Sequence, residues 1–190
     1  YHSNYSDFAR QCSDEERSYF VFCGVRNPLD NAASLYVKFL NDQNKAYSEE
    51  RWRLEKAGDV SKRRVALYKY LKNVDSSFDA FLCKFYDFRN FPYTSNSDIN
   101  ARFCNDIIRF ESMEDDFEKI LNQLGITKKR PLPRRNPTGS KEYFLKYYEN
   151  KQTRKMAVRI FGPAMEEWGY SFPDVWNAGK CDMIAQTRYS

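Results

Sequence analysis

Residues 19–40, YFVFCGVRNPLDNAASLYVKFL, decide how the rest of this chain is interpreted. Residues 19–25 are apolar, aromatic and β-branched, which is typical of a buried strand. Asn27 is a favourable helix N-cap, Pro28 suits the first helical position, and Asp30 stands three residues after the cap. The segment therefore predicts a strand, a tight turn and a helix.

The predicted helix has an apolar side and places a hydroxyl near the turn. Helical spacing brings one stripe together, made of Ala33, Tyr36, Val37 and Leu40. Arg26 lies where the strand ends, and Ser34 lies about two turns into the helix, on the same face as Asn27. An arginine and a hydroxyl that converge beside a helix N-terminus form an anion site. We therefore expect Arg26 and Ser34 to bind an anion; the alternative is an ordinary capped helix after a strand.

A second segment repeats this strand-and-helix pattern. Residues 107–110 predict a short strand, and Ser112 is positioned to cap the helix that follows. The apolar stripe of this helix consists of Phe117, Ile120, Leu121 and Leu124. Gly125 is expected to end it. Two such units favour an α/β fold with a parallel sheet and crossover helices.

The other helical patterns are aromatic. One stripe, Phe78, Phe81, Leu82 and Phe85, predicts a core helix, with the wall of an acceptor groove as the alternative. Residues 143–148 begin a terminal helical region, which continues through Val158, Phe161, Met165 and Trp168. Gly162-Pro163 is expected to end or kink that helix. Gly169 is expected to be its C-cap.

Length and composition are those of a globular domain. The chain has 190 residues, of which 42% are hydrophobic and 17% aromatic, enough for one domain with a sizeable core. No apolar run is long enough for a membrane span. The five cysteines are scattered without a CxxC pair, and His2 is the one histidine. This pattern predicts reduced thiols, a cytoplasmic location and no metal site.

Positive charge is concentrated between residues 128 and 141. Six cations lie there with no acid among them: Lys128, Lys129, Arg130, Arg134, Arg135 and Lys141. Because the net charge of the whole chain is +5, this loop carries the entire basic excess. Such a cluster predicts a phosphate, sulfate or polyanion as partner, with a solvated surface loop as the alternative.

These motifs resemble a known enzyme family. Residues 25–36, VRNPLDNAASLY, are similar to the 3′-phosphate-binding motif of sulfotransferases that use 3′-phosphoadenosine 5′-phosphosulfate (PAPS). In that motif a strand is followed by Arg-x-Pro and a helix with a serine eight residues after the arginine. Arg26 and Ser34 occupy these positions.

Later segments extend the resemblance, in order, over residues 1–173. DIIRFESMEDDFEKILNQLGI (106–126), LPRRNPTGSKEYFLKYY (132–148) and MEEWGYSFP (165–173) look like segments of the carbohydrate-modifying branch. The N-terminal Tyr1-His2-Ser3 resembles the histidine-containing stretch of that branch. Asn31 departs from the family, which often has arginine at this place.

The resemblance implies a P-loop NTPase-like parallel sheet flanked by helices, in a helix-rich α/β fold. The family's 5′-phosphosulfate loop, with its Lys or Arg, Gly, Ser and Thr, has no counterpart in this sequence, and no GxxxxGK occurs. We therefore expect the first strand and loop to lie upstream. Residues 1–190 would then form a single sulfotransferase-like domain that is partial, its C-terminal portion.

The implied reaction is transfer of a sulfuryl group from PAPS to a hydroxyl, with an oligosaccharide as the expected acceptor and no metal. By resemblance, Arg26 and Ser34 bind the 3′-phosphate, and Arg135 and Thr138 in the basic loop contact the nucleotide. His2 is the expected general base, with an exposed terminal histidine as the alternative. Glu111 is either a second acid–base group or a structural carboxylate at the end of a strand.

Two other functions remain open from the sequence. A kinase-like phosphotransferase would use a similar strand-loop-helix, but it needs a Walker loop and a Mg²⁺-binding carboxylate. A non-catalytic polyanion or RNA-binding module would use the basic loop and the aromatic residues at 143–148. We expect no nucleic-acid partner. Eukaryotic members of the resembled branch work in the Golgi lumen, which is the alternative location.

Overall fold

The computed structural model describes residues 5–45, 47–48, 59–86, 101–132 and 143–176. The chain divides into two compact units, each built from two segments of sequence. Unit 1 comprises residues 1–27 and 94–139, and unit 2 comprises residues 28–93 and 140–190.

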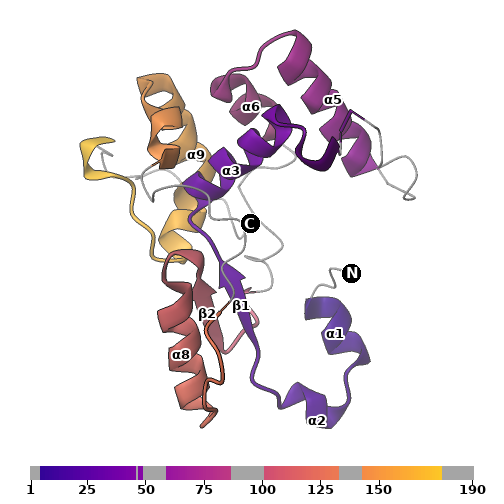
Figure 1. Cartoon of the computed structure of the whole chain (residues 1–190), viewed down its shortest axis with the longest axis vertical. Helices are drawn as coiled ribbons and strands as arrows, with labels where there is room; N and C mark the ends of the chain where they lie inside the picture. The colour runs from indigo at the N-terminus through magenta and orange to yellow at the C-terminus, as the bar shows by residue number, and fades with distance from the viewer. Residues whose placement is uncertain (1–4, 46, 49–58, 87–100, 133–142, 177–190) are drawn as a thin grey trace, which may run out of the picture. The chain divides into compact units, whose positions relative to one another are not determined.

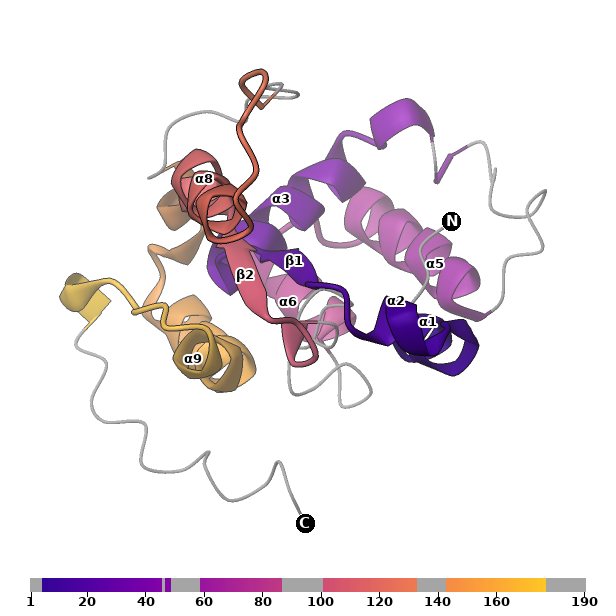
Figure 2. The same ribbon diagram turned by 90° about the horizontal axis from the view of Figure 1, so that it is seen from below.

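Unit 1 contains a small parallel sheet. Its described elements are α1 (Tyr5–Gln11), α2 (Asp14–Arg17), β1 (Phe22–Val25), β2 (Asp106–Arg109), the 3-10 turn η2 (Phe110–Ser112) and α8 (Met113–Gln123). β1 and β2 lie side by side, with Val25 opposite Arg109, and α8 runs along β2 (Figure 1). The same neighbours are seen from below in Figure 2. The predicted parallel pairing and the helix after each strand are confirmed.

β1 starts later than the sequence predicts. The amide of Tyr19 donates to the carbonyl of Glu16 at 3.2 Å, which keeps Tyr19 in the turn that ends α2. Val21 and Asn105 then exchange two hydrogen bonds, at 2.8 Å to the Asn105 side chain and at 2.7 Å from its amide. The strand ladder therefore begins at Phe22, and the prediction of a strand over residues 19–21 is wrong.

The burial of β1 also differs from the prediction. Val25 is 3% exposed, whereas Phe22 is 41% exposed and alternate residues face different sides. Phe22 contacts Phe117 of α8, with ring centroids 6.2 Å apart. Within unit 1, β1 is therefore a partly covered strand and not the buried strand that its composition indicates.

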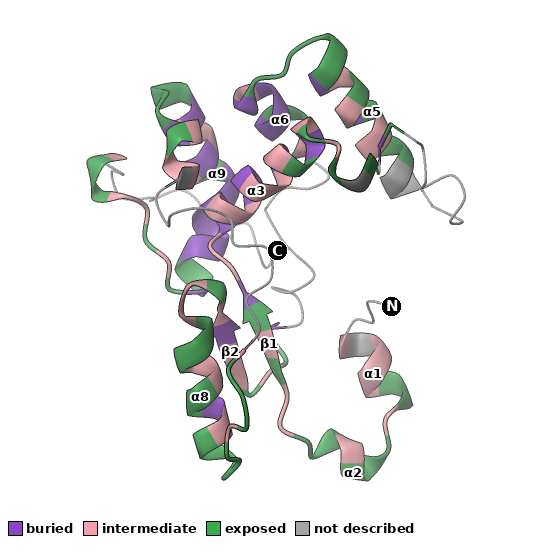
Figure 3. Ribbon diagram, viewed as in Figure 1, coloured by how far each residue is buried: buried purple, intermediate pink, exposed green. Residues whose placement is uncertain are grey.

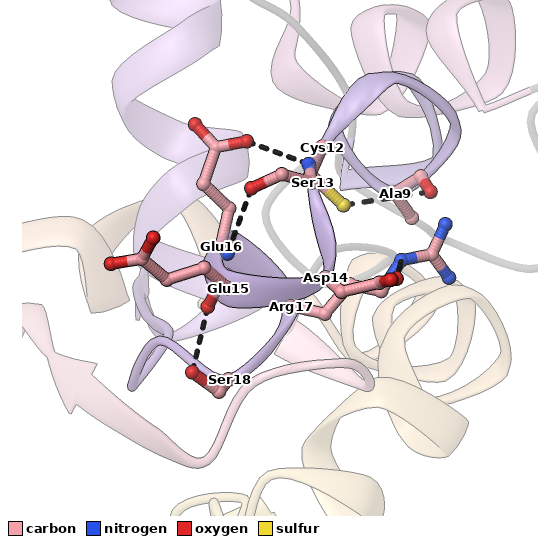
Figure 4. Close-up of polar contacts among 8 residues, drawn as sticks. All are labelled: Ala9, Cys12, Ser13, Asp14, Glu15, Glu16, Arg17 and Ser18. Atoms are coloured by element: carbon pink, nitrogen blue, oxygen red, sulfur yellow. Dashed lines mark hydrogen bonds and ion pairs between the residues drawn. The ribbon is translucent and has the colours of Figure 1, made fainter.

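α2 shows why the chain can turn sharply before β1. The Ser13 hydroxyl accepts a hydrogen bond from the Glu16 amide at 3.2 Å, and the Glu16 carboxylate accepts one from the Ser13 amide at 2.8 Å (Figure 4). This capping box satisfies two amides at the start of a four-residue helix. The Ser18 hydroxyl donates to the Glu15 carbonyl at 2.7 Å and closes the other end.

Gly125 ends α8, as predicted. Its φ of 67° lies in the left-handed region, which residues with a Cβ adopt at a cost. The amide of Ile126 donates to the Leu121 carbonyl at 2.8 Å, and the amide of Gly125 donates to the Asn122 carbonyl at 3.1 Å. These two bonds satisfy carbonyls at the end of α8.

Unit 2 is helical in its described part. Its elements are α3 (Pro28–Leu40), η1 (Gln43–Lys45), α5 (Asp59–Asn73), α6 (Phe78–Phe85), η3 (Tyr143–Tyr148), α9 (Lys151–Glu167) and η4 (Asp174–Trp176). α3 packs against α5, α6, α9 and η3. It begins at Pro28, as the Asn27-Pro28 pair predicts.

The core of unit 2 is aromatic and centred on α3 and α6. Phe39 and Phe81 are 0% exposed, and their ring centroids lie 5.9 Å apart. Figure 3 shows the buried faces of α3, α6 and α9 in purple. Phe78, Phe81 and Leu82 of the predicted stripe are therefore core, as predicted, and Phe85 is half-buried.

The buried stripe of α3 is rotated from the predicted one. Its buried residues are Pro28, Leu29, Ala32, Ala33, Tyr36 and Phe39. Val37 and Leu40 are only half-buried, because the helix turns Phe39 toward the rings of Tyr47 and Phe81. The prediction of Ala33 and Tyr36 is confirmed, and that of Val37 and Leu40 is wrong.

α9 continues through Pro163, so Gly162-Pro163 does not end the helix, and the predicted continuation of the helix through Val158, Phe161 and Met165 is confirmed. Every residue from Ile160 to Met165 is buried. Burial of this continuous apolar segment outweighs the hydrogen bond that proline cannot donate. The helix ends at Glu167 and its C-cap is Trp168, one residue before the predicted Gly169. Gly169 takes the left-handed conformation after the cap, with a φ of 68°, and the Tyr170 amide donates to the Met165 carbonyl at 2.7 Å.

The fold is thus helix-rich with a small parallel sheet, which is compatible with the α/β class. A P-loop NTPase-like sheet and a single partial domain over residues 1–190 stay predictions.

Replacing Phe81 with alanine is expected to destabilise unit 2 by about 3–5 kcal/mol, because a fully buried ring leaves a cavity among its neighbours. Chemical denaturation measures the change in unfolding free energy. Val74, which is 70% exposed, provides the control: Val74→Ala should change stability by less than about 0.5 kcal/mol. Equal effects of the two substitutions would contradict the assignment of Phe81 to the core.

Replacing Gly125 with alanine is expected to cost about 1–2 kcal/mol of stability. An added Cβ would meet nothing within 4 Å, so the cost comes from the backbone alone. Gly125→Asn is the matched control, since asparagine tolerates the left-handed conformation, and it should cost clearly less. Thermal or urea unfolding checks both, and an unchanged stability of Gly125→Ala would refute a strained turn.

Candidate functional site

The candidate site lies at the carboxyl ends of β1 and β2 in unit 1. Arg26 and Asn27 follow β1, and Phe110 and Glu111 follow β2. Because the strands are parallel, these four residues emerge at one edge of the sheet. In α/β proteins, this edge is where ligands usually bind.

Arg26 lies over an aromatic ring. Its Cζ atom is 4.5 Å from the centre of the Phe110 ring, and the Phe110 side chain is 45% exposed. A cation–π contact attracts the charge of the guanidinium to the ring face, whereas anions are bound by its N–H groups. The contact therefore orients the arginine and remains compatible with a bidentate bond to a phosphate.

Glu111 joins the ends of the two strands. Its Oε1 atom accepts a hydrogen bond from the Asn27 amide at 2.9 Å, across 84 residues of sequence. Of the two roles considered for Glu111, this bond supports the structural one. A carboxylate that accepts a backbone bond holds the turn after Arg26 in place.

A second carboxylate holds the end of β2. Asp116 of α8 accepts hydrogen bonds from the Arg109 amide at 2.7 Å and from the Ser112 hydroxyl at 2.9 Å. Ser112 stands at the N-cap of α8, as predicted, but its side chain makes no capping bond. The hydroxyl instead donates to Asp116, one helical turn into α8. Asp116 thus anchors the strand from which Phe110 and Glu111 extend.

Ser34 lies in unit 2, in the second turn of α3. It is half-buried, beside the fully buried Ala33 on the same helix. The Tyr148 hydroxyl donates to the Leu29 carbonyl at 2.9 Å and ties η3 to the first turn of α3. Arg26 and Ser34 belong to different units, and their convergence on one anion stays a prediction.

The other predicted site residues lie outside the described residues. His2 precedes residue 5, and Arg135 and Thr138 fall within 133–142. Of the basic loop, the described part includes Lys128, which is half-buried. Lys128 lines a shallow hollow of about 450 Å³ with Glu118, Leu121, Asn122, Gly125, Ile126 and Thr127.

Burial shifts the pKa of two tyrosines in unit 2. Burial raises the pKa of Tyr36, and the nearby Tyr147 and Asp75 raise it further. The Tyr36 hydroxyl donates to the Ser76 carbonyl at 2.5 Å. Burial also raises the pKa of Tyr47. Both side chains therefore stay neutral near pH 7 and act in the core and not as bases.

Metal clusters, membrane-spanning helices and disulfides are absent from the described residues. No group of three or more His, Cys, Asp or Glu there is arranged to hold a metal ion. No described helix is both long and apolar enough to cross a membrane. Cys12, Cys23, Cys83 and Cys104 form no disulfide.

Comparison with known proteins agrees with the motif at the strand end. The family model described as "Sulfotransferase family" matches residues 1–165. The chain belongs to the sulfotransferase family. The matched residues include the strand, turn and helix with Arg26 and Ser34, and they include Arg135 and Thr138 of the basic loop. Comparisons with curated proteins and with solved structures gave no match.

Membership in the family confirms the resemblance seen in residues 25–36. The family supports a transferase activity that moves a sulfuryl group. Sequence reasoning missed the roles of Phe110 and Asp116. The signal for Phe110 was its position: an aromatic residue directly after a strand parallel to that of Arg26. Asp116 carried no comparable signal, because one acid among several on a helix is usually a solvated charge.

Proposed function

We propose that this sulfotransferase transfers a sulfuryl group from PAPS to a hydroxyl of a carbohydrate acceptor. Arg26 and Ser34 bind the 3′-phosphate, Arg135 and Thr138 contact the nucleotide, and His2 is the general base. The observation that carries the proposal is the placement of Arg26, supported on Phe110 at the carboxyl edge of a parallel strand pair. Membership in the family supports it.

The chemistry requires little beyond positioning and charge. The acceptor oxygen bonds to sulfur while the bond from sulfur to the 5′-phosphate oxygen breaks, and the acceptor proton passes to the base. Negative charge grows on the departing adenosine 3′,5′-bisphosphate, which the cations of residues 128–141 stabilise. A histidine with an ordinary pKa of about 6.5 is suited to take the proton near neutral pH.

The family match favours sulfuryl transfer over the two other functions considered. A kinase-like phosphotransferase requires Mg²⁺-binding carboxylates, and Glu111 and Asp116 instead bind backbone amides. An RNA-binding module would use exposed aromatic residues, whereas Tyr148 is 0% exposed. Cytoplasmic location, with the Golgi lumen as alternative, remains part of the proposal.

Arg26→Ala is expected to weaken binding of adenosine 3′,5′-bisphosphate about ten- to hundredfold, since it removes charge-assisted bonds to the 3′-phosphate. Calorimetric titration measures the affinity. Arg26→Lys should recover little, because lysine lacks the planar fork. The control is Arg17→Ala, which removes an exposed arginine of α2. Equal affinities of the Arg26→Ala and wild-type chains would refute the assignment of the 3′-phosphate to Arg26.

His2→Ala is expected to lower turnover about 10²–10⁴-fold while leaving bisphosphate affinity unchanged, because a general base acts on the acceptor hydroxyl. Sulfate transfer from PAPS to a panel of oligosaccharides measures turnover. His2→Gln is the matched control: it keeps a polar side chain but cannot take a proton, so it should be equally slow. Near-normal turnover of either variant would remove His2 from the mechanism.

A further inference from the structure

The turn after β1 offers a ligand few backbone donors. The N–H of Asn27 is already bound to the Glu111 carboxylate at 2.9 Å, and Pro28 has no N–H. Two consecutive positions after Arg26 therefore provide no amide to an incoming phosphate. At these two positions the backbone offers no donor, and the side chain of Arg26 is the group suited to a phosphate.

Glu111 restrains the orientation of the peptide group between Arg26 and Asn27. The peptide group between Arg26 and Asn27 is planar, so a bond to the Asn27 amide fixes the orientation of the whole group. That orientation sets the direction in which the Arg26 side chain leaves the backbone. Glu111 is itself placed by β2, whose residue Arg109 stands opposite Val25.

Phe110 contacts the guanidinium at the other end of the Arg26 side chain. Its ring lies 4.5 Å from the guanidinium carbon, so the long side chain is supported near its tip as well as at its base. An arginine held at both ends loses less conformational entropy when it binds an anion. Two adjacent residues after β2 thus restrain Arg26, which follows β1: Phe110 contacts its guanidinium, and Glu111 binds the amide of the next residue.

We propose that Phe110 and Glu111 are positioning residues for Arg26, so that the 3′-phosphate is bound by the arginine fork and not by the backbone of the turn. This inference rests on the proposed function of the site. Glu111 acts as a hydrogen-bond acceptor, and its negative charge is not needed for this role. That distinction separates it from an acid–base catalyst.

The test compares Glu111→Gln with Glu111→Ala in calorimetric titrations with adenosine 3′,5′-bisphosphate. Glu111→Ala removes the acceptor, and the affinity is expected to fall about tenfold. Glu111→Gln keeps an oxygen that accepts from Asn27 and removes a negative charge near the phosphate, so its affinity should equal or exceed that of the wild type. Sulfuryl turnover of Glu111→Gln at saturating PAPS should also be retained.

Phe110 is tested in the same way. Phe110→Ala should weaken bisphosphate binding about two- to fivefold, the loss expected for an exposed cation–π contact. Phe110→Tyr keeps the ring and should restore the affinity. In an Arg26→Ala background, Phe110→Ala and Glu111→Ala should have no further effect, because both act through the arginine.

A second ligand distinguishes positioning from a general structural role. Adenosine 5′-monophosphate lacks the 3′-phosphate, so its affinity should not change in Glu111→Ala or Phe110→Ala. Equal losses for the two nucleotides, or wild-type affinity of both alanine variants, would overturn the inference while leaving the Arg26 site intact. If the wild-type chain bound the bisphosphate no better than the monophosphate, the proposed function itself would fail, and the inference with it.

Discussion

The parallel pairing of β1 with β2 is the constraint on which the candidate site depends. Parallel strands end at the same edge of a sheet, so residues that follow β1 meet residues that follow β2. Antiparallel pairing of the same strands would send Arg26 and Glu111 to opposite ends. The bonds from Asp116 and Glu111 to backbone amides then fix each strand end. A four-residue ladder therefore organises side chains 84 positions apart.

Unit 2 holds α3 within a core of aromatic side chains. α3 is surrounded by aromatic rings, and Phe39, Phe81 and Tyr148 have no exposed surface. A helix packed on several sides keeps its remaining face in a fixed geometry, and the half-buried Ser34 lies on this helix. The many tilted and edge-to-face ring contacts around Tyr36 and Phe78 add directional preference to that packing.

Local signals in the sequence predicted the ends of elements well. Asn27-Pro28, Gly125 and Gly169 act through their own backbone chemistry, so their effects do not depend on distant residues. Arg26 could be placed at a strand end for the same reason. Ser34 could be placed on its helix but not relative to Arg26.

The predictions that were wrong depend on contacts between residues far apart in the sequence. The rotation of α3 toward Phe39 depends on rings of Tyr47 and Phe81, and the continuity of α9 through Pro163 depends on burial of its neighbours. The bond from Asn27 to Glu111 is also long-range. Periodicity within one segment contains none of this information, because it describes one face without saying what covers it.

The division of each unit into two sequence segments has a consequence for synthesis. β1 leaves the ribosome well before its partner: at about 5–20 residues per second, the 84 residues to Glu111 take roughly 4–17 s. During that interval the strand exposes an unpaired edge, which is a template for association with other chains. Asp14, Glu15 and Glu16 stand just ahead of it in α2. Charged residues that flank an apolar strand are known to oppose such association.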